Sequence, residues 1–172
     1  MRCPTHCLRE TVSQHPASPG VIADDERLSR AGYGPTTHYK KGKVTAQIVR
    51  KTDILNGGTL SLWRTPAGNE ALLDIAENKL RANTPAGQWL YDHFIPTARD
   101  FRAIVLPDGK RGFSVVDDCE TGSGPDPMHC GLKVCDHIGP LTDEDERYII
   151  LKTALWKLFK SNPRDTHTPS TP

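Results

Sequence analysis

Residues 128–138, Met-His-Cys-Gly-Leu-Lys-Val-Cys-Asp-His-Ile, decide how the fold and its chemistry are interpreted. Apolar and polar residues alternate over most of this segment, and a period of two predicts a strand. Successive side chains of a strand point to opposite faces, so Cys130 is expected to face the core and Cys135 and His137 to face away from it. His129 and His137 then share a face but lie about 26 Å apart, at roughly 3.3 Å per residue. Only Cys135 and His137 stay close to one another.

Four more strands are predicted before this segment, in two hairpins. Pro107-Asp108-Gly109-Lys110 places Pro and Gly where a turn needs them, between two runs rich in β-forming residues. Asn56-Gly57-Gly58 is a second turn signal. The expected strands are residues 43–51 and 59–64 in one hairpin, and residues 101–106 and 111–116 in the other.

Four helices are predicted from capping residues and from apolar positions that recur three and four residues apart. The closing helix has the clearest pattern. Its apolar residues share one face, and acidic residues occupy its first turn, where the helix dipole favours them. The expected helices are residues 24–30, 69–83, 85–95 and 142–160.

Strands that follow one another in antiparallel runs, interrupted by helices, favour an α+β fold. We expect a mixed or mainly antiparallel sheet of about five strands with helices packed on one face. Residues 23–162 are expected to form a single α+β domain. Residues 1–22 and 163–172 hold prolines among scattered polar residues and little that could be buried, which predicts disordered, mobile tails.

Composition excludes several classes of protein. The chain has 172 residues, a formal net charge of +1 and 36% apolar residues, so it is neither a polycationic tail nor a highly acidic chain. No apolar run approaches the roughly 18 residues that span a bilayer, and no secretory signal pattern is present. Five irregularly spaced cysteines do not suit a secreted disulfide framework. We therefore expect a cytoplasmic protein with no membrane partner.

A basic segment indicates an anionic partner. Residues 37–52 contain no acid, whereas acids gather around residues 117–126 and 143–146. A near-neutral total therefore conceals a polarised charge distribution of the kind that steers charged partners. Tyr33 and Tyr39 lie near enough in sequence to stack on bases, but no motif for sequence-specific reading is present. We expect an interaction module that docks a protein, or nucleic acid without sequence specificity, through Lys40, Lys41, Lys43, Arg50 and Lys51.

A small enzyme, a hydrolase or transferase, is the first alternative. Cys119 would be its nucleophile and His129 its base, with Asp117 or Asp118 orienting the imidazole. Residues 129–134, His-Cys-Gly-Leu-Lys-Val, resemble the histidine-led strand of papain-like cell-wall and amide hydrolases. In those families the nucleophile opens a helix, whereas Cys119 precedes a loop of Gly, Ser and Pro.

A second enzymatic site is suggested at Arg64. Residues 60–64, Leu-Ser-Leu-Trp-Arg, resemble the short strand that ends in a cofactor-binding arginine in ADP-ribosyltransferase-like folds. The resemblance implies that Arg64 would handle a nucleotide cofactor. The companion Ser-Thr-Ser strand of that family is not visible, and no catalytic glutamate is identified. The plainer interpretation leaves Trp63 packed and Arg64 in solvent.

Zinc binding is the remaining alternative. Cys119, Cys130, Cys135 and His137 carry suitable donor atoms, but their spacing is neither C-x2-C nor H-x3-H. The strand geometry leaves only Cys135 with His137 as a close pair. Zinc is the one cofactor that the sequence suggests, and a buried Cys130 that fills a small core position is the plainer interpretation of that thiol.

Overall fold

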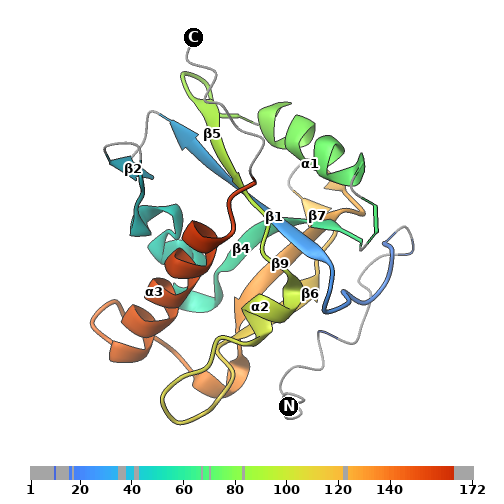
Figure 1. The fold of residues 1–172 in the computed structure, drawn as a ribbon. Helices are drawn as coiled ribbons and strands as arrows, with labels where there is room; N and C mark the ends of the chain where they lie inside the picture. The colour runs from blue at the N-terminus through green and yellow to red at the C-terminus, as the bar shows by residue number, and fades with distance from the viewer. Residues whose placement is uncertain are drawn as a thin grey trace.

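The computed structural model describes Glu10, Pro16 and residues 18–34, 38–40, 43–66, 68–69, 71–82, 84–121 and 124–164. Five strands form one sheet in the order β5-β1-β4-β9-β6, and every neighbouring pair is antiparallel (Figure 1). The prediction of an α+β fold with a mainly antiparallel sheet is confirmed. The strands are β1 (Arg27–Gly34), β4 (Thr59–Thr65), β5 (Trp89–Phe94), β6 (Phe113–Asp117) and β9 (His129–Val134).

Short elements connect these strands. Among the described residues, two pairs of two-residue strands form small hairpins, and four 3₁₀ turns lie in the connections. The hairpins are β2 (Tyr39–Lys40) with β3 (Lys43–Val44), and β7 (Glu120–Thr121) with β8 (Gly124–Pro125). The 3₁₀ turns are η2 (Ala46–Ile48), η3 (Lys51–Asp53), η4 (Leu55–Gly57) and η5 (Asp136–Ile138).

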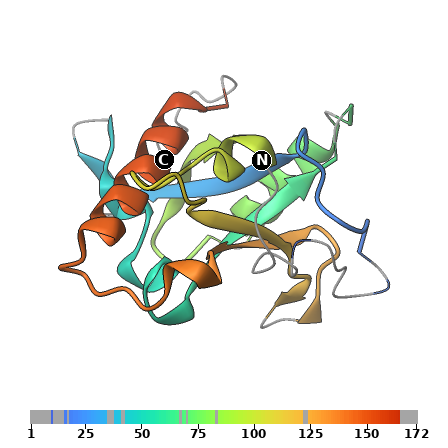
Figure 2. The same ribbon diagram turned by 90° about the horizontal axis from the view of Figure 1, so that it is seen from below.

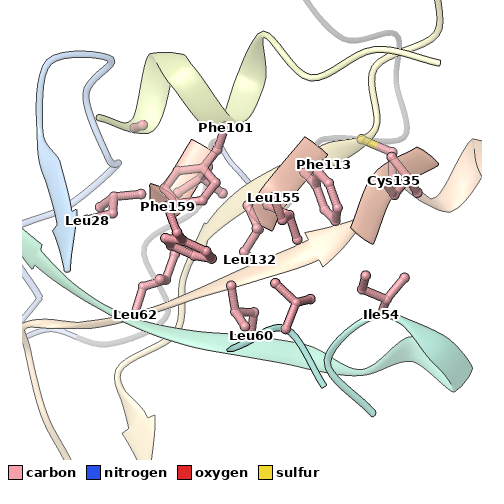
Figure 3. Packing of buried hydrophobic residues seen from close by; sticks show 14 of the residues in the cluster. Leu28, Ile54, Leu60, Leu62, Phe101, Phe113, Leu132, Cys135, Leu155 and Phe159 are labelled. Atoms are coloured by element: carbon pink, nitrogen blue, oxygen red, sulfur yellow. The ribbon is translucent and has the colours of Figure 1, made fainter. Parts of the chain in front are cut away.

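The main core lies between one face of the sheet and two helices, α2 (Ala98–Arg102) and α3 (Glu146–Ser161) (Figure 2). Leu155 and Phe159 of α3 pack onto the strands beside Leu62 (Figure 3). Burying a leucine or phenylalanine completely contributes about 1.5–3 kcal/mol, so this layer is the main source of stability. Asp145 caps α3 by accepting a hydrogen bond from the Arg147 N–H at 2.9 Å.

A smaller cluster lies on the other face of the sheet. Helix α1 (Ala71–Ala82) buries Leu80 there against Ala31 of β1, with Trp63 of β4 packed beside them. Leu62 belongs to the main core, and neighbouring strand residues point to opposite faces, so Trp63 faces away from that core. The sheet therefore has one thickly covered face and one that α1 covers only in part.

Two predicted helices are wrong because strand pairing overrides the local pattern. Residues 24–30 were expected to be helical, but Asp24 and Asp25 form a turn and β1 begins at Arg27, hydrogen-bonded to strands on both sides. Residues 85–95 were also expected to be helical. Pro85 instead opens a turn that Gly87, at φ +76°, completes, and β5 follows.

Two predicted strands are also wrong. Residues 43–51 contain only the two-residue β3 and then coil into 3₁₀ turns, so no hairpin joins them to β4. Residues 101–106 complete α2 and an irregular segment. The cause is a capping box, in which Thr97 Oγ1 accepts from the Asp100 N–H at 3.3 Å and the Asp100 carboxylate accepts from the Thr97 N–H at 2.8 Å.

The packed part of the chain extends past both predicted domain boundaries. Ile22 is buried in the main core, and the Gly20 carbonyl accepts a hydrogen bond from Arg64 at 2.6 Å. At the other end, Pro163 pairs with Phe94, and the Arg164 N–H donates to the His93 carbonyl at 2.7 Å. The mobility expected for residues 1–22 and 163–172 concerns residues that lie mostly outside those described.

Candidate functional site

A cavity opens where β1 and β4 separate. The two strands pair only from Arg27 opposite Thr65 to Ser29 opposite Trp63. Beyond that point β1 continues along β5, while β4 continues along β9, and the two strands diverge (Figure 1). A cavity of about 360 Å³ lies at the split, bounded by both strands, the end of α1 and the segments around residues 38, 50 and 85–88. Its volume is within the usual range of small-molecule sites, roughly 300–1,000 Å³.

Arg30 bridges the split between the strands. Its Nη1 donates to the Ser61 carbonyl of β4 at 3.1 Å, and its Nη2 lies 3.4 Å from the Ile48 carbonyl. The side chain is 13% exposed. Burial lowers the pKa of Arg30 and the nearby Asp53 carboxylate opposes that change, but a guanidinium stays protonated in proteins. The cavity thus has a fixed positive charge at its inner end.

Asp53 links Arg30 to a second arginine, Arg50. Arg50 donates to Asp53 Oδ1 from Nε at 3.1 Å and from Nη2 at 2.9 Å, and its backbone N–H donates to Oδ2 at 2.8 Å. Arg30 Nη2 lies 3.5 Å from the same Oδ2. The Asp53 side chain is fully buried, whereas that of Arg50 is 62% exposed. One carboxylate therefore serves two guanidinium groups, and the cluster keeps one net positive charge.

Aromatic and neutral polar side chains form the rest of the wall. Tyr33 and Trp63 line the cavity, together with Gln88 from the connection that follows α1. Lys79 Nζ lies 4.9 Å from the Trp63 ring centroid, a cation–π contact. None of the residues that line this cavity is acidic. The wall therefore combines cations with rings, which suits an anionic ligand that carries a planar group.

His38 contributes a neutral imidazole to this cavity. The Tyr33 N–H donates to its Nδ1 at 3.5 Å, so the proton of the neutral ring is on Nε2. Burial, followed by the charges of Arg30 and Arg50, lowers the pKa of His38 below its ordinary value near 6.5. The imidazole is therefore uncharged at pH 7 and adds a hydrogen-bond donor instead of a third cation.

The predicted basic residues lie at and beside this cavity. Arg50 lines it directly, and Lys51 follows and pairs with Asp143. Lys40 and Lys43 stand opposite one another in the β2–β3 hairpin. Lys41 lies outside the described residues. We call Lys40, Lys43, Arg50 and Lys51 the basic face. Arg30, Ser29 and Trp63 were not predicted as residues of this cavity, because their place in it depends on the divergence of β1 from β4.

Arg64 is enclosed in a buried ion-pair network. Its Nε and Nη2 donate to the two Glu26 carboxylate oxygens at 2.9 and 2.7 Å, and its Nη1 donates to the Gly20 carbonyl at 2.6 Å. Asp117 Oδ1 lies 3.5 Å from the same Nη1. The Arg64 side chain is 1% exposed, so the expectation of a solvated arginine is wrong. Each guanidinium nitrogen has a protein partner, and the side chain is enclosed by protein.

Asp118 and His129 lie together, but through the backbone of the aspartate. His129 Nδ1 is hydrogen-bonded to the Asp118 carbonyl oxygen, and the imidazole meets the Trp63 ring edge-on, with centroids 6.0 Å apart. Cys119 is completely buried, and its carbonyl accepts from the Asp126 N–H at 2.6 Å. A nucleophile must be reachable by substrate, and this thiol is enclosed by protein.

The prediction that Cys130 faces the core is confirmed, and the prediction that Cys135 faces away from it is wrong. Cys130 is buried, as expected for its position in β9. The strand ends at Val134, and Cys135 caps η5, so the alternation breaks and Cys135 also packs in the main core, near Phe113 (Figure 3). Its Sγ lies 3.2 Å from Ser114 Oγ.

The zinc alternative gains no third ligand from this arrangement. Burial raises the pKa of Cys135, which disfavours the thiolate that a metal needs. His137 follows in η5 and is partly buried. Within the described residues, no three His, Cys, Asp or Glu side chains group so that they could hold a metal ion.

Comparisons with models of protein families, with curated proteins and with solved structures found no match. In the part of the chain that the structure describes, no helix is both long enough and apolar enough to cross a membrane.

Proposed function

We propose that this protein is a non-enzymatic module that binds single-stranded nucleic acid on its basic face. The observation that carries the proposal is the position of the cavity. It adjoins the basic face at Arg50 and has Tyr33 and Trp63 in its wall. Proteins that bind single strands combine cations along the backbone with rings on which bases stack.

The charges support a phosphate backbone as the partner. Lys40 and Lys43 project from neighbouring positions of a hairpin and have no acidic partner among the described residues. Arg50 and Arg30 share a single carboxylate, so their cluster also keeps positive charge. Each cation that contacts a phosphate releases counterions and adds to affinity.

The rings favour nucleic acid over an acidic protein. Carboxylate side chains would satisfy the lysines, but they have no planar group for a wall formed by Tyr33 and Trp63. The bases of a single strand are unstacked and can turn into such a cavity, whereas those of a duplex are held in its interior. A cavity of about 360 Å³ suits one nucleotide unit.

Binding without catalysis is supported by the side chains that are missing from the cavity wall. None of its lining residues is a carboxylate or a cysteine, and its one imidazole, His38, is hydrogen-bonded to the backbone at Nδ1. General acid–base chemistry needs a proton donor and acceptor matched in position and pKa. Cys119, the one nucleophile considered, is buried elsewhere.

Fluorescence anisotropy with a labelled 12-nucleotide strand of mixed sequence tests the proposal. We expect affinity to fall with added salt, by a log–log slope of about −0.7 per phosphate contact. The variant Lys40→Glu/Lys43→Glu should weaken binding at least tenfold. The control Arg99→Glu/Lys110→Glu carries the same change of charge on α2 and in the turn that follows it, at exposed positions outside the basic face, and should bind normally.

Two outcomes would overturn the proposal. The first is no binding of the strand at low salt. The second is equal weakening by the two charge-reversal variants, since non-specific attraction to a polyanion predicts that result. Poly-glutamate serves as the competitor for an acidic protein partner, and displacement of the strand by poly-glutamate at matched charge concentration would also contradict a preference for nucleic acid.

A further inference from the structure

The inner end of the cavity contains buried polar atoms that lack partners. Ser29 is fully buried, and its Oγ has no hydrogen-bond partner among the described residues. Arg30 Nε is also buried and also lacks a hydrogen-bond partner among the described residues, although the other two nitrogens of that guanidinium donate to the Ser61 and Ile48 carbonyls. A buried donor without a partner costs about 1–3 kcal/mol. Both residues line the cavity, where a ligand with acceptor atoms would remove that cost.

The charge at this inner end calls for an anion. Arg30 Nε can only donate, so its missing partner must be an acceptor. Asp53 neutralises one of the two arginines, and no acid lines the cavity, so one positive charge is left over. Oxygen atoms of a phosphate group supply both the acceptors and the opposite charge.

The exposure of the two arginines gives the cavity a direction. The Arg30 side chain is 13% exposed and the Arg50 side chain is 62% exposed, so Arg30 marks the closed end and Arg50 the mouth. A phosphodiester within a strand carries a nucleoside on both sides, and one of these would have to enter ahead of the phosphate. A terminal phosphate monoester has no such group and presents three oxygens to the closed end.

We infer that this cavity binds the terminal phosphate monoester of a nucleic-acid strand, with the phosphate at Ser29 and Arg30 and the last base against Tyr33 and Trp63. The inference rests on the proposed function and gives it a specificity for strand ends. Phosphates farther along the strand would then contact Arg50 at the mouth and Lys40 and Lys43 outside it. No bond is made or broken in this interaction.

Calorimetric titration with three strands of one sequence tests the inference: 5′-phosphorylated, 3′-phosphorylated and unphosphorylated. We expect one phosphorylated strand to bind at least tenfold tighter than the unphosphorylated strand, and the position of its phosphate identifies the end that is bound. AMP should bind and adenosine should bind at least tenfold more weakly, because the phosphate supplies the anion. Equal affinity for all three strands would overturn the inference and leave the proposed function standing.

Variants separate the cavity from the basic face. Ser29→Ala removes only the hydroxyl and should reduce the preference for the phosphorylated strand to twofold or less. Arg30→Gln should also reduce the preference for the phosphorylated strand to twofold or less. If the loss of the Arg30 hydrogen bonds prevents folding, the Ser29→Ala result alone decides the test. Lys40→Glu/Lys43→Glu should weaken all three strands by a similar factor. Binding of AMP without binding of any strand would support the cavity site and contradict the proposed function, whereas an unchanged preference in Ser29→Ala would contradict the inference.

Discussion

The guanidinium of Arg64 and the carboxylate of Glu26 form a bidentate ion pair, with Nε to Oε2 at 2.9 Å and Nη2 to Oε1 at 2.7 Å. The two side chains are 1% and 6% exposed. Buried charges are tolerated only when paired and hydrogen-bonded, so this pair indicates a structural role for Arg64. It holds the segment before β1 against β4, because its Nη1 also binds the Gly20 carbonyl.

Loss of Arg64 should therefore destabilise the fold. Arg64→Ala leaves the Glu26 and Asp117 carboxylates buried without their cation, which costs about 3–5 kcal/mol. Urea denaturation should show this loss, and Arg99→Ala, on the exposed surface of α2, should stay within about 0.5 kcal/mol of the parent protein. An arginine reserved for a cofactor would give the opposite result: Arg64→Ala would leave stability unchanged.

Loss of the Asp53 carboxylate should also destabilise the fold, because it pairs with both arginines of the cavity. Asp53→Asn removes the one negative charge between Arg30 and Arg50, and the two guanidinium groups then repel each other around a buried amide. We expect a loss of about 3 kcal/mol in the free energy of unfolding, measured by urea denaturation. Asp143→Asn is the matched control, because it breaks the exposed pair with Lys51 and should leave the denaturation midpoint where it was.

Stability should fall at alkaline pH because of two buried thiols. Burial raises the pKa of Cys130 and of Cys135. Above the ordinary thiol pKa of about 8.5, the unfolded chain loses these protons while the native protein keeps them. The unfolded state then binds fewer protons, so the free energy of unfolding decreases as pH rises from about 8.5 toward the raised native values, by up to about 1.4 kcal/mol per pH unit for each thiol.

Denaturation of the parent protein and of Cys130→Ala/Cys135→Ala between pH 8 and 10 isolates this effect. The double variant should be less stable near pH 8, since it leaves small voids, but its stability should depend less steeply on pH. The contribution of lysines and tyrosines is common to both proteins and cancels in the comparison. Parallel curves for the two proteins would mean that the thiols ionise normally in the native state.

The elements predicted correctly are those whose pattern is complete within one segment. The alternation in β9 and the apolar stripe of α3 each identify a buried face without help from another part of the chain. Residues 85–95 were wrongly predicted as a helix because proline is common both in the first turn of a helix and in a tight turn. Pairing with β1 decides between the two, and that pairing is a property of the whole sheet.

The candidate site was predictable only in part, for the same reason. Arg50 belongs to a basic segment and could be named from composition. Arg30 is flanked by ordinary strand residues, and its role arises because β1 and β4 separate after Ser29 and Trp63. In α2, by contrast, Thr97 and Asp100 stand three residues apart, and that capping box is a local signal from which the start of α2 could have been predicted.

The position of the β2–β3 hairpin, which carries Lys40 and Lys43, depends on a close contact between Gly32 of β1 and Tyr39 of β2. A Cβ atom on Gly32 would overlap the Tyr39 hydroxyl oxygen and stand 2.9 Å from its Cζ, closer than carbon atoms can approach. Gly32→Ala must therefore displace the ring, which packs against the main core. Overpacking of this kind costs about 1–3 kcal/mol.

Displacement of Tyr39 should also weaken the binding of single strands, because Lys40 is the next residue of the hairpin and moves with it. The thermal midpoint and the anisotropy titration measure the two effects in one variant. In a Tyr39→Phe background the nearest atom is gone, so Gly32→Ala should cost less in both measurements than it does beside the tyrosine. Equal costs in the two backgrounds would show that the alanine acts on β1 itself and that the hairpin is held by other contacts, such as the hydrogen bond of 3.1 Å from Trp156 Nε1 to the Val44 carbonyl.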